Sequence, residues 1–113
     1  MRMVFIISPY GGSEQNVVLA KRYMRMAAAH GLVPIAPHVM FDGVLNDHVA
    51  AERAAGMEAG RMIMGLCQEV WICGAAVTSG MLLDMQATNL PRTRVVPAAL
   101  ENWELHNIGR RSE

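Results

Sequence analysis

Two clusters of small residues mark the places where this sequence could do chemistry. The first, Ser8-Pro9-Tyr10-Gly11-Gly12, interrupts an apolar run and precedes a helical pattern. At such a strand-to-helix turn, backbone amides can approach an anion or a sugar closely, because glycine has no side chain. A plain tight turn is the alternative interpretation, since glycines end strands in many folds.

The second cluster precedes an unusual carboxylate. Gly74 ends a later apolar run, and Thr78-Ser79-Gly80 begins the next helical pattern. Asp84 follows four residues after Gly80, so its side chain lies about one helical turn further along and can return to the same side of the helix. An aspartate that simply faces solvent on an amphipathic helix is the alternative.

Acidic residues and histidines also gather in the middle of the chain. Asp42, Asp47 and His48 lie close in sequence, with His38 just upstream. Their spacing matches no recognised ligand pattern, and helix caps or solvated loop charges explain them more simply. We therefore expect no metal and no cofactor.

Alternating apolar runs and helical patterns must position these residues. Short apolar runs predict strands at 3–7, 69–74 and 93–97, and the proline-bounded segment 32–37 is typical of an edge strand. Helices are expected from Ser13, a candidate N-cap, to Gly31, from Asn46 or Asp47 to about Gln68, and over 79–89, with a loop at 41–48. Residues 98–113 give no firm signal and are treated as a C-terminal tail after a domain at 1–97.

This order predicts a single α/β domain with a four-stranded, mainly parallel, Rossmann-like sheet and helices on both faces. Ligands in such folds bind beyond the carboxyl ends of the strands. Those ends are the segment 8–12, the pair Pro37 and His38, and the segment 74–80.

Composition narrows the function classes. The chain has 113 residues, 52% of them hydrophobic, with ten basic and ten acidic residues. The charge balance argues against a nucleic-acid polymer or an anionic membrane as partner. Cys67 and Cys73 are interpreted as buried thiols in a reducing compartment, so a soluble, cytoplasmic protein is expected. The small residues of segment 48–66 favour a homodimer or a larger homo-oligomer.

Four ordered segments carry a family resemblance: FIISPYGGS, GLVPIAPHVMF, EVWICG and TSGMLLDM. Together, over about residues 3–97, they resemble the nucleoside 2-deoxyribosyltransferase-like superfamily, in particular its small phage and bacterial branch of DUF4406-like and DUF7768-like proteins. The resemblance implies a carboxylate nucleophile that attacks the anomeric carbon of a sugar. It also implies a first-strand turn that contacts the sugar or a 5′-phosphate.

The resemblance transfers roles to particular positions. Asp84 occupies the nucleophile's position, with Thr78 and Gly80 matching the turn that precedes it. Phe5 stands where the family has a tyrosine that orients the nucleophile, and Glu69 stands where it has an aspartate. Asp84 is also one methylene shorter than the usual glutamate.

We therefore expect binding of a nucleoside or nucleotide, with cleavage or transfer of its N-glycosidic bond. Asp84 is the candidate nucleophile and Asp47 the candidate acid. The candidate substrate-binding residues are Ser8, Pro9, Tyr10, Gly11, Gly12, His38, Thr78, Ser79 and Gly80. A non-catalytic nucleotide-binding or sensing module is the first alternative, and a structural, oligomer-forming protein is the second.

Overall fold

The computed structural model describes residues 1–11 and 13–108, in which strands and helices alternate. The elements are β1 (Arg2–Ile7), α1 (Glu14–Ala29), β2 (Leu32–Ile35), α2 (Pro37–Met40), α3 (Ala50–Met64), β3 (Glu69–Cys73), α4 (Ser79–Gln86), β4 (Arg92–Val95) and α5 (Pro97–Asn107). All four expected strands are present, with ends shifted by one or two residues.

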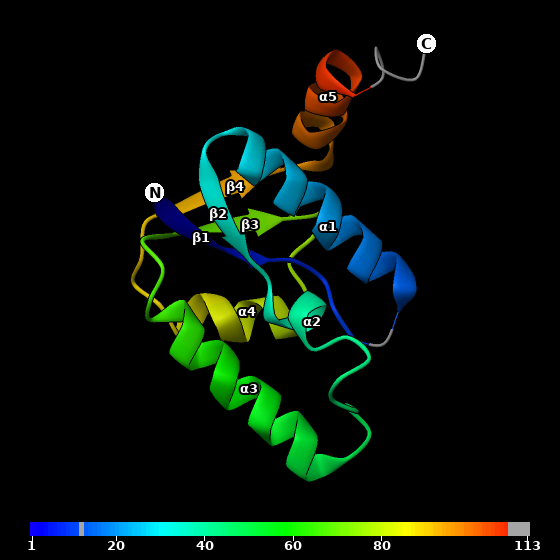
Figure 1. The fold of residues 1–113 in the computed structure, drawn as a ribbon, viewed down its shortest axis with the longest axis vertical. Coiled ribbons are helices and arrows are strands. Elements are labelled where there is room, and N and C mark those ends of the chain that lie inside the picture. The colour runs from blue at the N-terminus through cyan, green and yellow to red at the C-terminus, as the bar shows by residue number, and fades with distance from the viewer. Residues whose placement is uncertain (12, 109–113) are drawn as a thin grey trace.

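The strands form one parallel sheet in the order β2-β1-β3-β4. Figure 1 shows α1 on one face of this sheet and α3 and α4 on the other. The expected single α/β domain with helices on both faces is confirmed, and every strand pair is parallel. β2 lies at an edge, as Pro34 predicts, because proline has no backbone N–H to donate to a neighbouring strand on that side.

Alternating side chains of β1 separate the two halves of the core. Val4 and Ile6 face α1, where they pack with Tyr23. Phe5 and Ile7 face the opposite side and pack with Met81 of α4. Because both faces of a central parallel strand are covered, β1 is apolar throughout its buried length.

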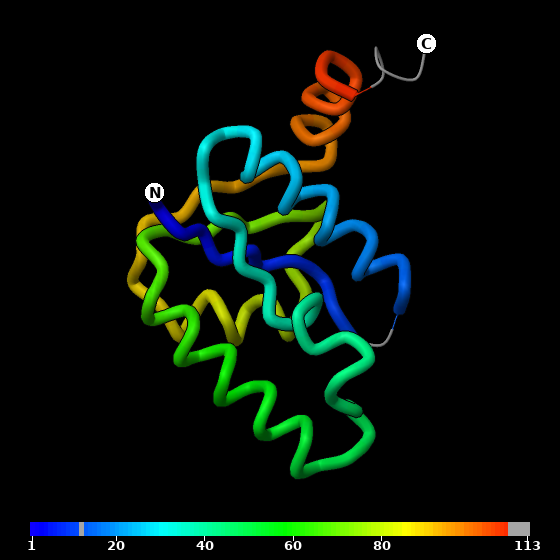
Figure 2. Tube along the Cα trace, in the orientation of Figure 1, coloured from blue at the N-terminus to red at the C-terminus, as the bar shows by residue number. Residues whose placement is uncertain are grey.

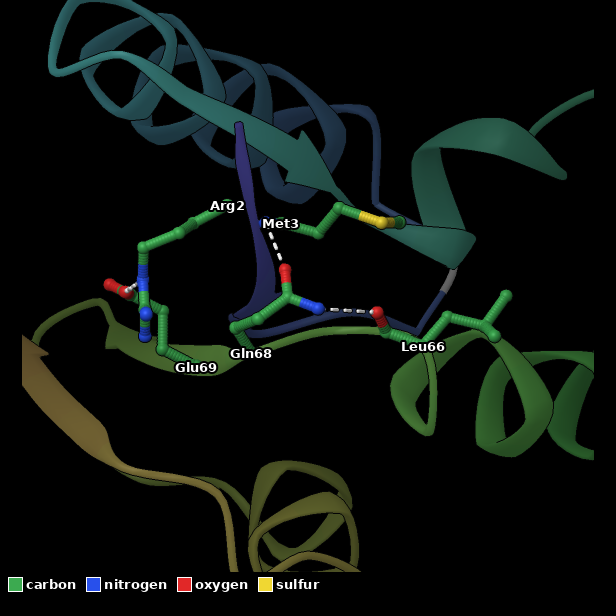
Figure 3. Close-up of polar contacts among 5 residues, drawn as sticks. All are labelled: Arg2, Met3, Leu66, Gln68 and Glu69. Atoms are coloured by element: carbon green, nitrogen blue, oxygen red, sulfur yellow. Dashed lines mark hydrogen bonds and ion pairs between the residues drawn. The ribbon is translucent and has the colours of Figure 1, made fainter.

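Polar contacts fix the amino-terminal end of the sheet (Figure 3). The backbone N–H of Met3 donates to Gln68 Oε1 at 2.6 Å, and Arg2 Nε donates to Glu69 Oε2 at 3.1 Å. Gln68 Nε2 donates in turn to the Leu66 carbonyl at 3.0 Å. Glu69 therefore lies at the end of β3 opposite to the carboxyl ends of the strands, with its carboxylate held by Arg2.

Of the two predicted N-cap residues, one is confirmed and the other is wrong. Ser13 caps α1, accepting the backbone N–H of Gln15 at 3.2 Å, as expected. The prediction that Asn46 or Asp47 caps the long helix is wrong, because Val49 is the N-cap residue and α3 begins at Ala50. The Asn46 side chain instead accepts the His48 N–H at 2.9 Å, which folds the turn before the helix.

Two helices have no counterpart in the sequence prediction. The short α2 begins with Pro37, a residue whose fixed φ suits a first helical turn. α5 occupies most of the predicted tail, where Leu100 is buried in the core beside Tyr23. Figure 2 shows α5 and α3 at opposite ends of the long axis of the molecule.

Both cysteines, Cys67 and Cys73, are free and buried, as expected. None of the helices in the described part of the chain combines the length and the apolar character needed to cross a membrane.

Candidate functional site

The end of β1 carries a buried polar pair. Ser8 is fully buried directly after the strand, and its Oγ lies 3.3 Å from Nε2 of His38 on α2. Burial lowers the pKa of His38, an effect that the charge of Asp42 partly opposes. The imidazole is therefore neutral at neutral pH, and α2 places it across the carboxyl end of the first strand.

Tyr10 connects this pair to the start of α4. Its ring packs against His38 with centroids 5.3 Å apart and an interplanar angle of 30°. Its hydroxyl donates to the Gly80 carbonyl at 3.3 Å, and a β-carbon at Gly80 would lie 3.2 Å from the phenol oxygen. The two small-residue clusters of the sequence thus meet at Tyr10.

Gly74 joins the same clusters a second time. Its φ of +109° is a left-handed conformation, and a β-carbon there would lie 3.1 Å from Pro9 Cδ. Its N–H donates to the buried Tyr23 hydroxyl at 3.2 Å, and its carbonyl accepts from Arg94 Nη2 at 2.5 Å. The loop after β3 is therefore held at a close approach that only glycine permits.

Asp84 is half-buried on α4. Burial raises its pKa from 3.8 to about 6, and Arg61 of α3 partly opposes that rise. Burial, followed by the charge of Asp84, raises the pKa of the Tyr10 phenol. Asp84 is thus not a plain solvent-facing aspartate, because its carboxylate is partly desolvated and acts on Tyr10.

Charges from the α3 region act on Tyr10 as well. Asp47, which is exposed in the turn before α3, raises the phenol pKa, and Arg53 of α3 lowers it. The ion pairs of the described residues involve neither Arg53 nor Arg61. Their positions two helical turns apart place them on one side of α3, which was the signal available in the sequence.

The remaining predicted residues lie at the rims of the two turns. Thr78 is the N-cap of α4, and its hydroxyl accepts the Met81 N–H at 3.2 Å. Ser79 is exposed at the first position of that helix. Gly11 is exposed with a φ of +123°, and Gly12 lies outside the described residues.

A cleft of about 440 Å³ opens on the α3 and α4 side of the sheet. It lies between the carboxyl ends of these two helices, lined by Arg61, Met64, Gly65, Ala87, Thr88, Asn89 and Leu90. Arg61 thus borders the cleft and also acts on Asp84.

A sequence model of one protein family, a domain of unknown function named DUF7768, matches residues 2–96. The chain belongs to the DUF7768 family. The matched residues include the whole sheet and every described residue of the strand-end cluster, whereas α5 follows them. No curated protein sequence matches the chain.

In this DUF7768 member, Tyr10 links three chemically useful groups, because its ring packs on His38 and the charge of Asp84 acts on its phenol. They are the Asp84 carboxylate with a pKa of about 6, the Tyr10 phenol and the neutral His38 imidazole. Within residues 1–11 and 13–108, no three His, Cys, Asp or Glu side chains gather closely enough to hold a metal ion. The arrangement offers a nucleophilic or basic carboxylate beside hydrogen-bonding groups that can orient a polar ligand.

Proposed function

We propose that this DUF7768 protein binds a nucleoside or nucleotide and cleaves or transfers its N-glycosidic bond, with Asp84 as the nucleophile. The observation that carries the proposal is the half-buried Asp84 carboxylate of α4, whose charge acts on Tyr10 in the turn after β1. The resemblance of the four sequence segments to nucleoside 2-deoxyribosyltransferase-like proteins supports the same assignment. Fold alone carries no activity, so the argument depends on these residues.

The reaction proceeds in two displacements. An Asp84 carboxylate oxygen forms a bond to the anomeric carbon while the carbon–nitrogen bond breaks, and its electron pair leaves with the base, which takes up a proton from an acid. Water or the nitrogen of a second base then attacks the anomeric carbon, loses a proton, and releases the Asp84 carboxylate. With a pKa of about 6, Asp84 is largely ionised at neutral pH and can attack.

The other residues bind and orient the substrate. Tyr10, with Gly11 and Gly80, contacts the sugar or its phosphate, while Asp47 remains the candidate acid because its charge reaches Tyr10. The Thr78 hydroxyl already caps α4, so its contribution is to fix the start of the helix that carries Asp84.

A non-catalytic nucleotide-binding module is the second candidate. Phe5 stands where nucleoside 2-deoxyribosyltransferase-like proteins have an orienting tyrosine. It is buried among apolar side chains on the α4 face of the sheet. In the described part of the structure, no hydrogen bond holds the Asp84 carboxylate, and a shorter side chain moves the reacting oxygen by about 1 Å, which can cost about a hundredfold in rate. The two free, buried cysteines favour a cytoplasmic location for either activity.

A ligand screen with an activity readout tests the proposal. Thermal shift against nucleosides and 5′-nucleotides identifies a ligand, and chromatography detects released base. We expect wild type to release base and Asp84→Asn to retain binding while release falls by several orders of magnitude, because the amide keeps the shape but removes the attacking charge.

The matched comparison introduces the glutamate and the tyrosine that nucleoside 2-deoxyribosyltransferase-like proteins carry at positions 84 and 5. Asp84→Glu should raise the rate of release if the carboxylate is only badly spaced, and the combination with Phe5→Tyr should raise it further if orientation is the defect. Binding without release in wild type, Asp84→Glu and the double variant would leave the binding module as the function. No shift with any of the ligands would contradict both candidates.

A further inference from the structure

Helix α3 is a long helix with little of its surface covered. Of its 15 residues, Met64 is the buried one. The side that faces away from the sheet exposes two methionines, Met57 at 45% and Met62 at 71%. These two side chains leave apolar surface exposed on the outer side of α3.

The sequence of this face reads symmetrically in both directions from the peptide between Ala59 and Gly60. Equal distances on either side of this midpoint bring together Glu58 with Arg61, Met57 with Met62, and Ala54 with Gly65. The first pair has opposite charges, the second is apolar and the third is small. In a two-fold interface, each contact between two different residues occurs twice, once on either side of the axis, so such a pattern is complementary to itself.

The charges of this pattern are available for a partner. Glu58 and Arg61 are both exposed, and the ion pairs found in the described residues, Arg2 with Glu69 and Arg22 with Glu104, leave them out. The small residues Ala54 and Gly65 are exposed as well, which allows two helix backbones to approach closely.

We propose that α3 is a dimer interface, in which a second copy of this chain packs its α3 antiparallel across a two-fold axis between Ala59 and Gly60. Glu58 of one copy then lies opposite the partner subunit's Arg61, and the reverse pair forms at the other side of the axis. Met57 and Met62 lie on the two flanks of this contact and border it with apolar side chains.

Self-complementarity selects a second copy over other partners. The face carries equal numbers of acidic and basic side chains, so it offers no uniform charge for an anionic membrane or a nucleic acid. A different protein could match the pattern, but opposite charges at equal distances from one point pair with each other under a two-fold rotation, whereas an unrelated partner gains nothing from that spacing.

A charge-swap experiment tests this geometry in the full chain. Sedimentation equilibrium at micromolar concentration should find wild type as a dimer. Glu58→Arg places like charges opposite each other twice, and we expect it to raise the dimer dissociation constant by about a hundredfold. Glu58→Arg combined with Arg61→Glu reverses both pairs and should restore the dimer to within about tenfold of wild type.

The matched control makes the same charge change elsewhere. Glu101→Arg, at an exposed position of α5, should leave the dimer intact. Circular dichroism confirms that each variant is folded, and Met62→Glu provides a second disruption that does not depend on the ion pairs. A monomeric wild type, a dimer that survives both Glu58→Arg and Met62→Glu, or a folded double variant that stays monomeric would each overturn the proposal.

Discussion

Asp84→Asn should stabilise the folded protein at neutral pH. Ionising a half-buried carboxylate costs free energy, and the rise of its pKa from 3.8 to about 6 reports that cost. A pKa rise of this size corresponds to a free-energy cost of about 3 kcal/mol for ionising Asp84 in the folded protein. Solvent screening around a half-exposed group reduces this cost to about 1.5 kcal/mol. An asparagine in the same place avoids the cost, because it carries no charge to desolvate.

The sign of the pH dependence provides the sharper test. Between pH 4 and 6 the folded Asp84 holds a proton that the unfolded chain has already released, so this residue makes the wild type lose stability as the pH rises through that range. Asp84→Asn removes this slope. Below pH 4, Asp84 is protonated in both the folded and the unfolded wild type. Wild type and Asp84→Asn should therefore be similarly stable there.

Urea unfolding and thermal melts of both proteins at pH 4.0 to 8.0 measure the effect. At pH 7.5, we expect the variant's melting temperature to rise by about 6 °C for a chain of this length. Asp47→Asn, at an exposed position, is the matched control and should change stability by less than about 0.5 kcal/mol. A variant that is no more stable than wild type at pH 7.5, with an unchanged pH profile, would show that Asp84 is not desolvated as described.

Three further predictions use the same cluster. Gly74→Ala should lower the free energy of unfolding by about 3 kcal/mol, because the new β-carbon would meet Pro9 while the backbone is left-handed. Gly31→Ala is the control: its φ is also positive, at +79°, but the space around it is open, so it should cost only about 1 kcal/mol in urea unfolding. Because burial lowers the pKa of His38, its unfolded form takes up a proton first as the pH falls through about 6.5, and His38→Gln should lessen the loss of stability seen there by thermal melts. Tyr10→Phe should weaken the affinity for any nucleotide found in the screen by about tenfold in calorimetry, through loss of one hydroxyl; an unchanged affinity would remove Tyr10 from the site.

Much of this fold could be predicted because its strands are short apolar runs between clear turn residues. The segments 3–7 and 69–74 are buried on both faces, so burial and sequence pattern agree there. Ser13 was also recognisable, because its hydroxyl meets a local need of the first helical turn. Such features depend on neighbours in sequence, which a single chain displays directly.

The missed features depend on contacts between distant residues. α5 is polar on most of its surface, and its place is fixed by Leu100 in the core and by a pair of hydrogen bonds from Arg22 to Glu104. The cap of α3 was assigned to Asn46 or Asp47 by residue type, but the Asn46 side chain is used within the preceding turn. Tyr10 could be placed in a turn from sequence, whereas its contact with Gly80, 70 residues away, could not.

The position of α5 has a consequence for how the protein forms during synthesis. All four strands precede α5, so the nascent chain can complete its sheet while the core beside Tyr23 still lacks Leu100. That apolar patch faces solvent or a chaperone until α5 leaves the ribosome, because domains assemble as their segments emerge. A ribosome stalled before α5 emerges therefore presents a paired sheet with one uncovered side, and the core is completed only by a helix that follows the residues 2–96 matched by the family model.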